Sequence, residues 1–290
     1  FAMMNNARLS VGSQGVQIAE RATQHARSFA AERMQSPRAD GSTGFTPAPI
    51  ADHPDVRRML LRMAAQTEAA RALVYHAAGQ IDRARLGDET ATARLGVLIP
   101  LVKAHGTDIG CEVASTGIQV HGGMGYIEET GAARYLRDAR IAPIYEGTNG
   151  IQAADLVGRK LIGDGGAAIR GVIAGFDQEA RIWPSLGTLA GIVSDGTDWM
   201  LSRSNVNDRL AGSYPYLTMM AILVCGGLMA RAHKAAQTML ADADGDHAFG
   251  RRKLATTRYY LENIVPEGTG LAAAAKCGAA MLYDFEDFIA

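Results

Sequence analysis

Apolar residues recur along the first half of the chain at intervals of three, four and seven residues, the spacing that gives a helix one buried face. A first stripe extends from Leu9 to Phe29 and a second from Val56 to Ile81. Residues 36–53, between them, hold three prolines and two glycines, which argues against regular structure there. The pattern therefore predicts two long helices joined by an irregular loop, with Pro54 in the first turn of the second helix.

A polar interruption separates the second helix from a third, predicted over residues 90–117, in which Pro100 is a candidate kink. Asn149 and Gln152 have the spacing of a capping box and predict the start of a fourth helix that ends at Leu161. The glycine-bearing segment between the third and fourth helices is then an insertion. This order of elements predicts a four-helix bundle.

The run Gly163-Asp164-Gly165-Gly166 is the best candidate for a domain boundary. Beyond it, the same periodicity predicts further helices over residues 167–182, 185–203, 217–241, 249–265 and 271–288. Pro266 is expected to end the helix that precedes it. We therefore predict an all-α chain with one bundle at residues 1–163 and a second helical domain at residues 164–290.

Composition narrows the class of protein. The 290 residues carry a formal net charge of −1, which argues against nucleic acid as a main partner. The longest apolar run, Leu217–Met229, is too short to cross a membrane. The three cysteines are far apart, which argues against a disulfide framework or a metal site and favours buried free thiols in a reducing compartment. The chain is therefore predicted to be cytoplasmic, with no metal, membrane or nucleic acid bound.

The segment Gln119–Gln152 holds the residues with the clearest chemical meaning. A glycine cluster, Gly122-Gly123-Met124-Gly125, is followed further along by Tyr145-Glu146-Gly147-Thr148. Glycines let the backbone approach a large ligand, and a carboxylate beside a glycine can be placed against that ligand as a base. The alternatives from the residues alone are a sharp turn after a helix and a solvent-facing glutamate in a turn that leads into a helix.

In order and spacing, the motifs Q-x-x-G-G-x-G-Y, R-D-A and Y-E-G-T resemble those in the C-terminal helical domain of the flavin-dependent acyl-CoA dehydrogenase family. The resemblance implies α,β-dehydrogenation of an acyl-CoA thioester with FAD as cofactor. It also implies that Phe1 already lies inside that domain, so that the chain is a fragment without the family's N-terminal helical and middle β-domains, and inactive alone. An acyl-CoA oxidase and a non-catalytic helical assembly module are the alternatives.

The resemblance gives the catalytic role to Glu146, which removes the α-proton while FAD accepts the β-hydride. A carboxylate desolvated by its ligand has a raised pKa and becomes a better base. In the family, the backbone N–H of this glutamate helps to hold the thioester carbonyl, and Gly147 has no side chain to block the acyl group. Arg8 matches a family arginine near the CoA moiety, although Asn5 stands where the family often has aspartate.

The adenosine-diphosphate end of FAD is assigned by the same resemblance. Gln119, Gly122 and Gly123 match the family's motif for this end, usually on the FAD of the neighbouring subunit. Arg33 matches an arginine that reaches the diphosphate, but the phenylalanine-glycine pair that usually follows it is absent. A solvated surface arginine is the alternative for Arg33.

Thr148 and Asn149 follow the base at the point where the family contacts FAD, and helix capping is the alternative for both. Gly150 departs from the glutamine that is frequent there. Residues after 163 resemble an extra helical module found in a larger subgroup of the family, with no catalytic constellation and an expected role in packing or oligomer contact. The implied partners are acyl-CoA, an electron-transfer flavoprotein as electron acceptor, and further copies in a homodimer or homotetramer.

Overall fold

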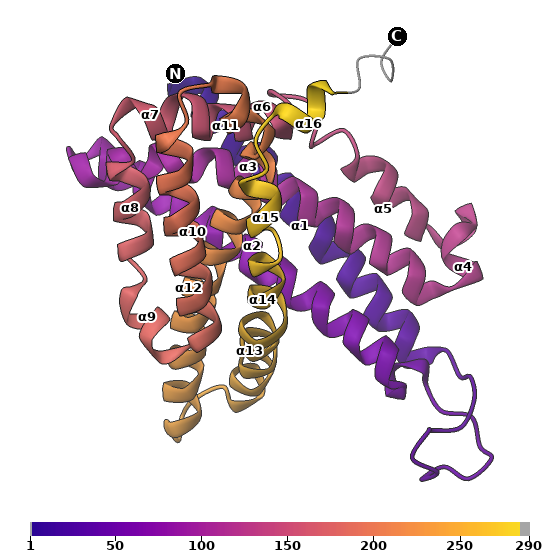
Figure 1. Cartoon of the computed structure of the whole chain (residues 1–290). Coiled ribbons are helices and arrows are strands. Elements are labelled where there is room, and N and C mark those ends of the chain that lie inside the picture. The colour runs from indigo at the N-terminus through magenta and orange to yellow at the C-terminus, as the bar shows by residue number, and fades with distance from the viewer. Residues whose placement is uncertain (1, 285–290) are drawn as a thin grey trace.

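A computed structural model describes residues 2–284, and within this part the fold consists of helices and the loops that join them (Figure 1). Among these residues, the strand-like pairing is limited to an isolated bridge between Met34 and Pro49, at the base of the loop after the first helix. The all-α prediction is confirmed.

Three long helices form the body of the N-terminal bundle. They are α1 (Ala2–Glu32), α2 (Pro54–Arg85) and α3 (Glu89–His121). Between α1 and α2 lies an exposed loop with one 3-10 turn, η1 (Ile50–Asp52). As predicted, Pro54 begins α2, where the N–H that proline lacks would have no partner in the helix. The third helix runs past Pro100 without interruption to His121, beyond the predicted end at residue 117.

The insertion and the fourth helix complete this bundle. The insertion contains α4 (Gly123–Tyr126), η2 (Glu128–Thr130) and α5 (Ala132–Ala139). The fourth helix is continued by a π-helical turn and consists of α6 (Asn149–Asp155), η3 (Leu156–Lys160) and α7 (Leu161–Gly163). A four-helix arrangement with an insertion was predicted, and the structure has it.

Glycines bring the backbones of α1 and α3 into direct contact. A Cβ atom added at Gly110 would lie 2.9 Å from the Cα of Gly15, and one added at Gly106 would lie 2.9 Å from the carbonyl oxygen of Gly12. Two helices can approach this closely only where neither carries a side chain. The two helices are therefore held at short range over several turns.

We expect Gly15→Ala to destabilise the fold by about 1–3 kcal/mol, because the new methyl group overlaps the carbonyl of Gly106 and the helices must move apart. Gly79→Ala in α2 is the matched control, since a Cβ there meets nothing within 4 Å. The control should gain about 0.5–1 kcal/mol, because alanine favours the helix. Urea unfolding followed by circular dichroism measures both, and equal stability of the two variants would contradict the expectation.

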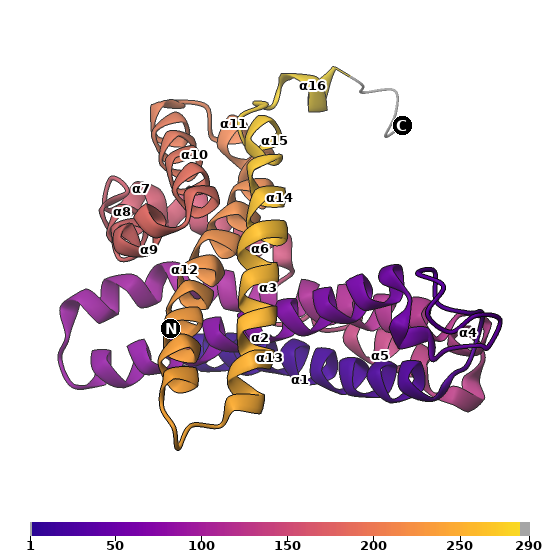
Figure 2. The same cartoon turned by 90° about the horizontal axis from the view of Figure 1, so that it is seen from below.

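The second half of the chain contains α8 (Ala167–Ala174), α9 (Asp177–Ile182), α10 (Pro184–Ser202), α11 (Val206–Ala211), α12 (Ser213–Ala241), α13 (His247–Tyr259), η4 (Tyr260–Ile264), α14 (Val265–Thr269), α15 (Ala272–Ala275) and α16 (Ala280–Tyr283). Figure 2 shows α12, α13 and α14 lying across the long helices of the first bundle. Contacts of α12 and α13 with α2 join the two halves.

Three expectations for this half were wrong in detail. Pro266 does not end a helix, because it lies in the first turn of α14, directly after the π-helical turn η4. A residue without a backbone N–H is tolerated in a first helical turn. The predicted helix over residues 167–182 is broken at Gly175 and Phe176 into α8 and α9. The predicted helix over residues 271–288 is reduced to the short α15 and α16, and its last four residues lie outside the described part of the chain.

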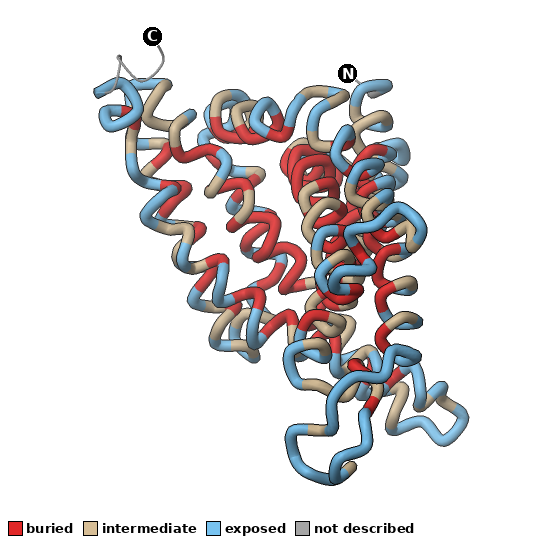
Figure 3. Tube along the Cα trace, turned by 90° about the vertical axis from the view of Figure 1, so that its right-hand side faces the viewer, coloured by how far each residue is buried: buried red, intermediate tan, exposed pale blue. Residues whose placement is uncertain are grey.

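A single hydrophobic core crosses the junction at residues 163–164. Figure 3 shows the buried positions along the helices in red. Its members from the two halves include Met63, Leu73, Leu101, Leu161, Ile169, Leu186, Leu223 and Tyr260. The thiol of Cys225, buried in α12, lies 3.6 Å from the carbonyl oxygen of Ala69 in α2. Cys111 is half-buried and Cys277 is exposed, so the expectation of buried thiols is met by Cys225 and was wrong for Cys277.

The helix α12 is longer than the apolar run predicted from the sequence. By length and hydropathy it is sufficient to span a membrane, but 78% of its most apolar stretch is buried inside the fold. A buried position against α2, α3 and α10 is what a core helix requires. Its apolar character is therefore explained by its place in the core.

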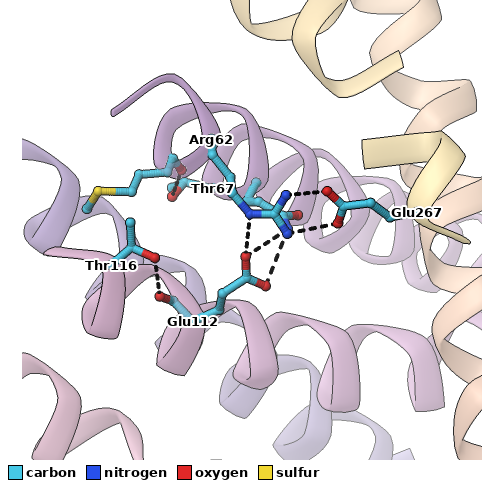
Figure 4. A network of polar contacts seen from close by, with 7 residues as sticks. Arg62, Thr67, Glu112, Thr116 and Glu267 are labelled. Atoms are coloured by element: carbon cyan, nitrogen blue, oxygen red, sulfur yellow. Dashed lines mark hydrogen bonds and ion pairs between the residues drawn. The ribbon is translucent and has the colours of Figure 1, made fainter. Parts of the chain in front are cut away.

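Charged side chains also join the halves. The Arg62 guanidinium on α2 donates to Glu112 on α3 (2.7 Å) and, through two nitrogens, to both carboxylate oxygens of Glu267 on α14 (2.6 and 2.9 Å; Figure 4). The hydrogen bonds to Glu267 raise the pKa of Arg62 above its usual range, against the opposing effect of burial. Lys253 on α13 bonds Glu68 on α2 at 2.6 Å. These contacts fix α13 and α14 on the first bundle.

Candidate functional site

The loop between α5 and α6 carries Glu146 in a strained conformation. Glu146 has a φ of 55°, and Ser36 is the other non-glycine residue with a positive φ in the described part of the chain. Gly147 follows with a φ of 84°, and a Cβ there would lie 3.0 Å from Nε2 of Gln152. Two consecutive left-handed residues make a sharp bend that leaves the Glu146 side chain exposed to solvent. Strain of this kind concentrates at functional sites, which motivates a functional hypothesis here.

The start of α6 differs by one residue from the predicted capping box. Thr148 is the cap, and its Oγ1 accepts from the backbone N–H of Ile151 at 3.3 Å. Gln152 is fully buried, and its Nε2 lies near the carbonyl oxygens of Glu146 and Gly147, at 3.5 and 3.4 Å. Asn149 is therefore the first helical residue, and its side chain turns into the bundle.

Asn149 is clamped to α3 by both ends of its amide. Its Oδ1 accepts from Nζ of Lys103 at 2.9 Å, and its Nδ2 donates to the carboxylate of Asp108 at 2.8 Å and to the hydroxyl of Thr107 at 2.9 Å. Its backbone N–H donates to the carbonyl of Pro143 at 2.9 Å and closes the loop that holds Glu146. Since these groups are all used within the protein, Asn149 can support a ligand site but does not offer its side chain to a ligand.

Lys103 and Asp108 were not singled out from the sequence. Lys103 is 0% exposed, and burial lowers its pKa to about 8, while the charges of Asp108 and Glu146 oppose that shift. Burial also raises the pKa of Asp108, against the hydrogen bonds from Tyr214 and Asn149 that lower it. The sequence contains one sign of their role: Lys103 lies inside the apolar run Leu98–Ala104, where burying a charge is costly unless it has a partner.

The depressed pKa of Lys103 predicts a pH dependence of stability. Between about pH 8 and the ordinary lysine value of 10.5, the unfolded chain holds a proton that the folded chain has released. Stability therefore rises with pH in this window, and below it the protonated lysine costs stability. Buried Cys225, whose pKa burial raises to about 12, acts in the opposite direction, so the lysine must be isolated by comparison with a variant.

We expect the free energy of unfolding of the wild type, relative to Lys103→Met, to increase from about pH 7.5 to about pH 9.5. Cys225 is present in both proteins, so its contribution cancels in the difference. Urea titrations at several pH values measure this difference. A constant difference across that range would show that Lys103 keeps an ordinary pKa in the folded chain.

Arg8 lies at the same end of the bundle as the Glu146 loop. Its charge acts on both Lys103 and Lys160, and its Nε is buried without a hydrogen-bond partner. From the loop, the Tyr145 hydroxyl donates to the side-chain oxygen of Gln14 on α1. The structure therefore brings Arg8, Glu146, Gly147 and Thr148 into one region, the first of two clusters.

The second cluster lies at the opposite end of α1 and α3. Arg33, Gln119, Gly122 and Gly123 line one cavity of about 590 Å³, together with Phe29, His53 and His121. A Cβ added at Gly122 or Gly123 would meet nothing within 4 Å, so the backbone there faces open space, and Gly122 has a φ of 60°. The four residues were predicted to act together, and the structure gathers them around one cavity.

The two clusters are well separated. Lys103 beside the first and Gln119 in the second lie sixteen residues apart on α3, or about 24 Å along the helix. A single small group cannot touch both. Among the described residues, no group of three or more His, Cys, Asp or Glu side chains has the geometry to hold a metal ion.

Comparisons with family models and with individual known proteins give matches that agree with one another. The chain matches the family model described as acyl-CoA dehydrogenase, C-terminal domain, over residues 2–161, and the model described as acetyl-CoA dehydrogenase C-terminal like over residues 167–286. It is 44% identical over 284 residues to the 3-methylmercaptopropionyl-CoA dehydrogenase of Ruegeria pomeroyi, covering 92% of the chain and 48% of that protein. A butyryl-CoA dehydrogenase of Syntrophomonas wolfei is 30% identical over 305 residues, covering 98% of the chain and 50% of that protein.

Among solved structures, ACDH-11 of Caenorhabditis elegans in complex with C11-CoA matches with a TM-score of 0.71 at 18% identity, over 98% of this chain and 48% of that one. This likeness concerns the fold alone. The chain spans about half the length of the curated relatives it matches.

Proposed function

Because the chain belongs to the acyl-CoA dehydrogenase family, we propose that it forms the C-terminal half of an FAD-dependent enzyme that dehydrogenates an acyl-CoA thioester between its α- and β-carbons. That enzyme, with the remaining family domains present, is called the complete enzyme below. The observation that carries the proposal furthest is the strained bend at Glu146 and Gly147, held against α3 by Asn149.

Glu146 is the proposed base. Its exposed carboxylate stands on a bend whose backbone is fixed on both sides, by the Asn149 N–H on Pro143 and by the Thr148 cap. Covering by a bound acyl chain would remove water from this carboxylate, raise its pKa and make it a stronger base toward the α-proton. Gly147 adopts the left-handed conformation that the bend beside the base requires, and Arg8 at the same end offers a positive charge for the CoA moiety.

FAD, when bound, would accept the hydride from the β-carbon. The residues of the second cluster fit the adenosine-diphosphate end of such a cofactor, because Arg33 offers a guanidinium and Gly122 and Gly123 leave backbone open at a cavity of about 590 Å³. At the first cluster, Thr148 is the candidate contact, and Asn149 would hold the loop in place from behind.

The separation of the two clusters supports a homo-oligomer. If each cluster binds a different FAD, two subunits share each FAD. The reactive end of that FAD lies at the first cluster of one subunit, and its other end contacts the second cluster of the other subunit. The proposed partners are therefore acyl-CoA, further copies of the chain in a dimer or tetramer, and an electron-transfer flavoprotein that takes electrons from the reduced flavin.

The test is anaerobic mixing of the complete enzyme with acyl-CoA substrates, including 3-methylmercaptopropionyl-CoA and butyryl-CoA. We expect the visible flavin spectrum to bleach and a 2-enoyl-CoA product to form. Re-oxidation by an electron-transfer flavoprotein supports a dehydrogenase, whereas fast re-oxidation by oxygen supports an acyl-CoA oxidase. A protein without flavin and without bleaching by any acyl-CoA would leave the helical assembly module as the function.

A further inference from the structure

One side chain of the second half bonds a residue that helps to hold the Glu146 loop. Tyr214, in the first turn of α12, donates its hydroxyl to Oδ2 of Asp108 on α3. The two residues are 106 positions apart in the sequence. Within the described part of the chain, this is the hydrogen bond by which the second half contacts the residues that bond the Asn149 side chain.

The other oxygen of Asp108 holds Asn149. Oδ1 accepts from Nδ2 of Asn149 at 2.8 Å, while the opposite end of that amide accepts from Lys103 at 2.9 Å. An amide bonded at both ends by charged groups has one orientation, because a flip would place its NH₂ against the ammonium and its oxygen against the carboxylate. Tyr214, Asp108 and Lys103 together therefore fix the direction of the Asn149 side chain.

Asn149 in turn fixes the loop. It follows Glu146 by three residues, and its backbone N–H closes the segment at Pro143. The bend is also contacted from inside by Nε2 of Gln152, which lies 3.5 and 3.4 Å from the carbonyl oxygens of Glu146 and Gly147. Since Asn149 and Gln152 both belong to α6, a change in the orientation of Asn149 should alter the direction of the Glu146 carboxylate.

We propose that Tyr214 is a positioning residue for Glu146, acting through Asp108 and Asn149, so that the second helical half forms part of the support of the active site. The inference rests on the proposed function of Glu146 as the base. It gives the second half a role in the reaction in addition to packing or oligomer contact. Tyr214 touches none of the reacting atoms, and its effect is on the direction of the base.

The charges around Asp108 agree with this role. The groups that face it are Tyr214 from α12, Lys103 on its own helix, Arg140 from the loop after α5 and the Cys111 thiol. Burial already raises the pKa of Asp108, and the Tyr214 hydroxyl is the first of the contacts that lower it. Loss of that hydroxyl should raise the Asp108 pKa further, so that the carboxylate is neutralised at a higher pH and its hold on Asn149 weakens there.

The test uses Tyr214→Phe in the complete enzyme, with Tyr216→Phe as the matched control. Tyr216 lies on the same helix and is fully buried, and its hydroxyl shares a 2.7 Å hydrogen bond with Thr197, away from the Glu146 loop. We expect Tyr214→Phe to lower the rate of flavin reduction about tenfold, the effect of losing one hydrogen bond to a charged group. FAD content and acyl-CoA affinity should stay within about twofold, and the pH below which the rate falls should move upward. Tyr216→Phe should change stability alone.

Two further variants make the result decisive. In an Asp108→Asn background, Tyr214→Phe should have a smaller additional effect, because the charged partner of the hydroxyl is gone and only its hydrogen bond with Asn149 is left to lose. Glu146→Gln is measured in parallel. If Glu146→Gln retains the wild-type rate, the proposed role of Glu146 as the base is wrong and this inference is wrong with it. If Glu146→Gln loses the rate while Tyr214→Phe keeps it, or if both tyrosine variants slow the enzyme equally, the positioning role is wrong and the proposed function stands.

Discussion

In the complete enzyme, Glu146→Gln is expected to lower the rate of flavin reduction by acyl-CoA at least 10²–10⁴-fold, roughly the general-base contribution. Glutamine keeps the size of the side chain and the backbone N–H, so the bend at Gly147 and the contacts of Asn149 should persist. It cannot accept the α-proton. Desolvation of the carboxylate by the acyl chain should place the loss at the upper end of this range.

Stopped-flow bleaching of the oxidised flavin under anaerobic conditions gives the rate, and FAD content and acyl-CoA affinity are measured in the same preparation. Glu129→Gln is the control, since Glu129 is an exposed carboxylate in η2 and its loss removes the same charge without touching the bend. Bleaching by Glu146→Gln within about threefold of the wild type would show that another group removes the proton.

Arg33→Ala is expected to weaken FAD binding by about 10–100-fold, because a hydrogen bond to a charged group contributes roughly 1.5–3 kcal/mol. Gln119→Ala on the same cavity should have a smaller effect, since its contact carries no charge. If the cofactor bridges two subunits here, Arg33→Ala should also weaken the oligomer. Both effects concern the cavity of the second cluster and leave the Glu146 loop unchanged.

Titration of the apoprotein with FAD measures the affinity, and analytical ultracentrifugation measures the oligomer. Arg251→Ala is the control, because Arg251 is an exposed arginine on α13 that does not line this cavity. An unchanged FAD affinity in Arg33→Ala would show that Arg33 is a solvated surface arginine.

The sequence predicted the long helices well because their apolar stripes are long and regular. The stripes Leu9–Phe29 and Val56–Ile81 lie inside α1 and α2, and Pro54 marked the start of α2. The capping box at Asn149 was wrong, because the spacing of polar residues alone does not tell whether Thr148 or Asn149 adopts the cap conformation. Pro266 was misjudged since a π-helical turn before it has no clear signal in sequence.

The candidate site could be predicted where a contiguous motif carries it. Glu146, Gly147 and the glycines at positions 122 and 123 stand in such motifs, whereas Lys103, Asp108 and Tyr214 do not. Their importance depends on contacts between helices, above all the pairing of Tyr214 with Asp108 across 106 residues. Local propensity contains no information about such a pairing, so only the folded arrangement reveals it.

The hydrophobic core that crosses residues 163–164 has a consequence for how the protein unfolds. Because α12 buries much of its surface against α2 and α3, separation of the two halves would expose apolar surface of both to water. The two halves should therefore melt in one cooperative transition, and a protease that cuts at Gly165 should yield two pieces that stay associated until both unfold. A destabilising substitution deep in α12 would then lower the amount of folded protein in both halves at once.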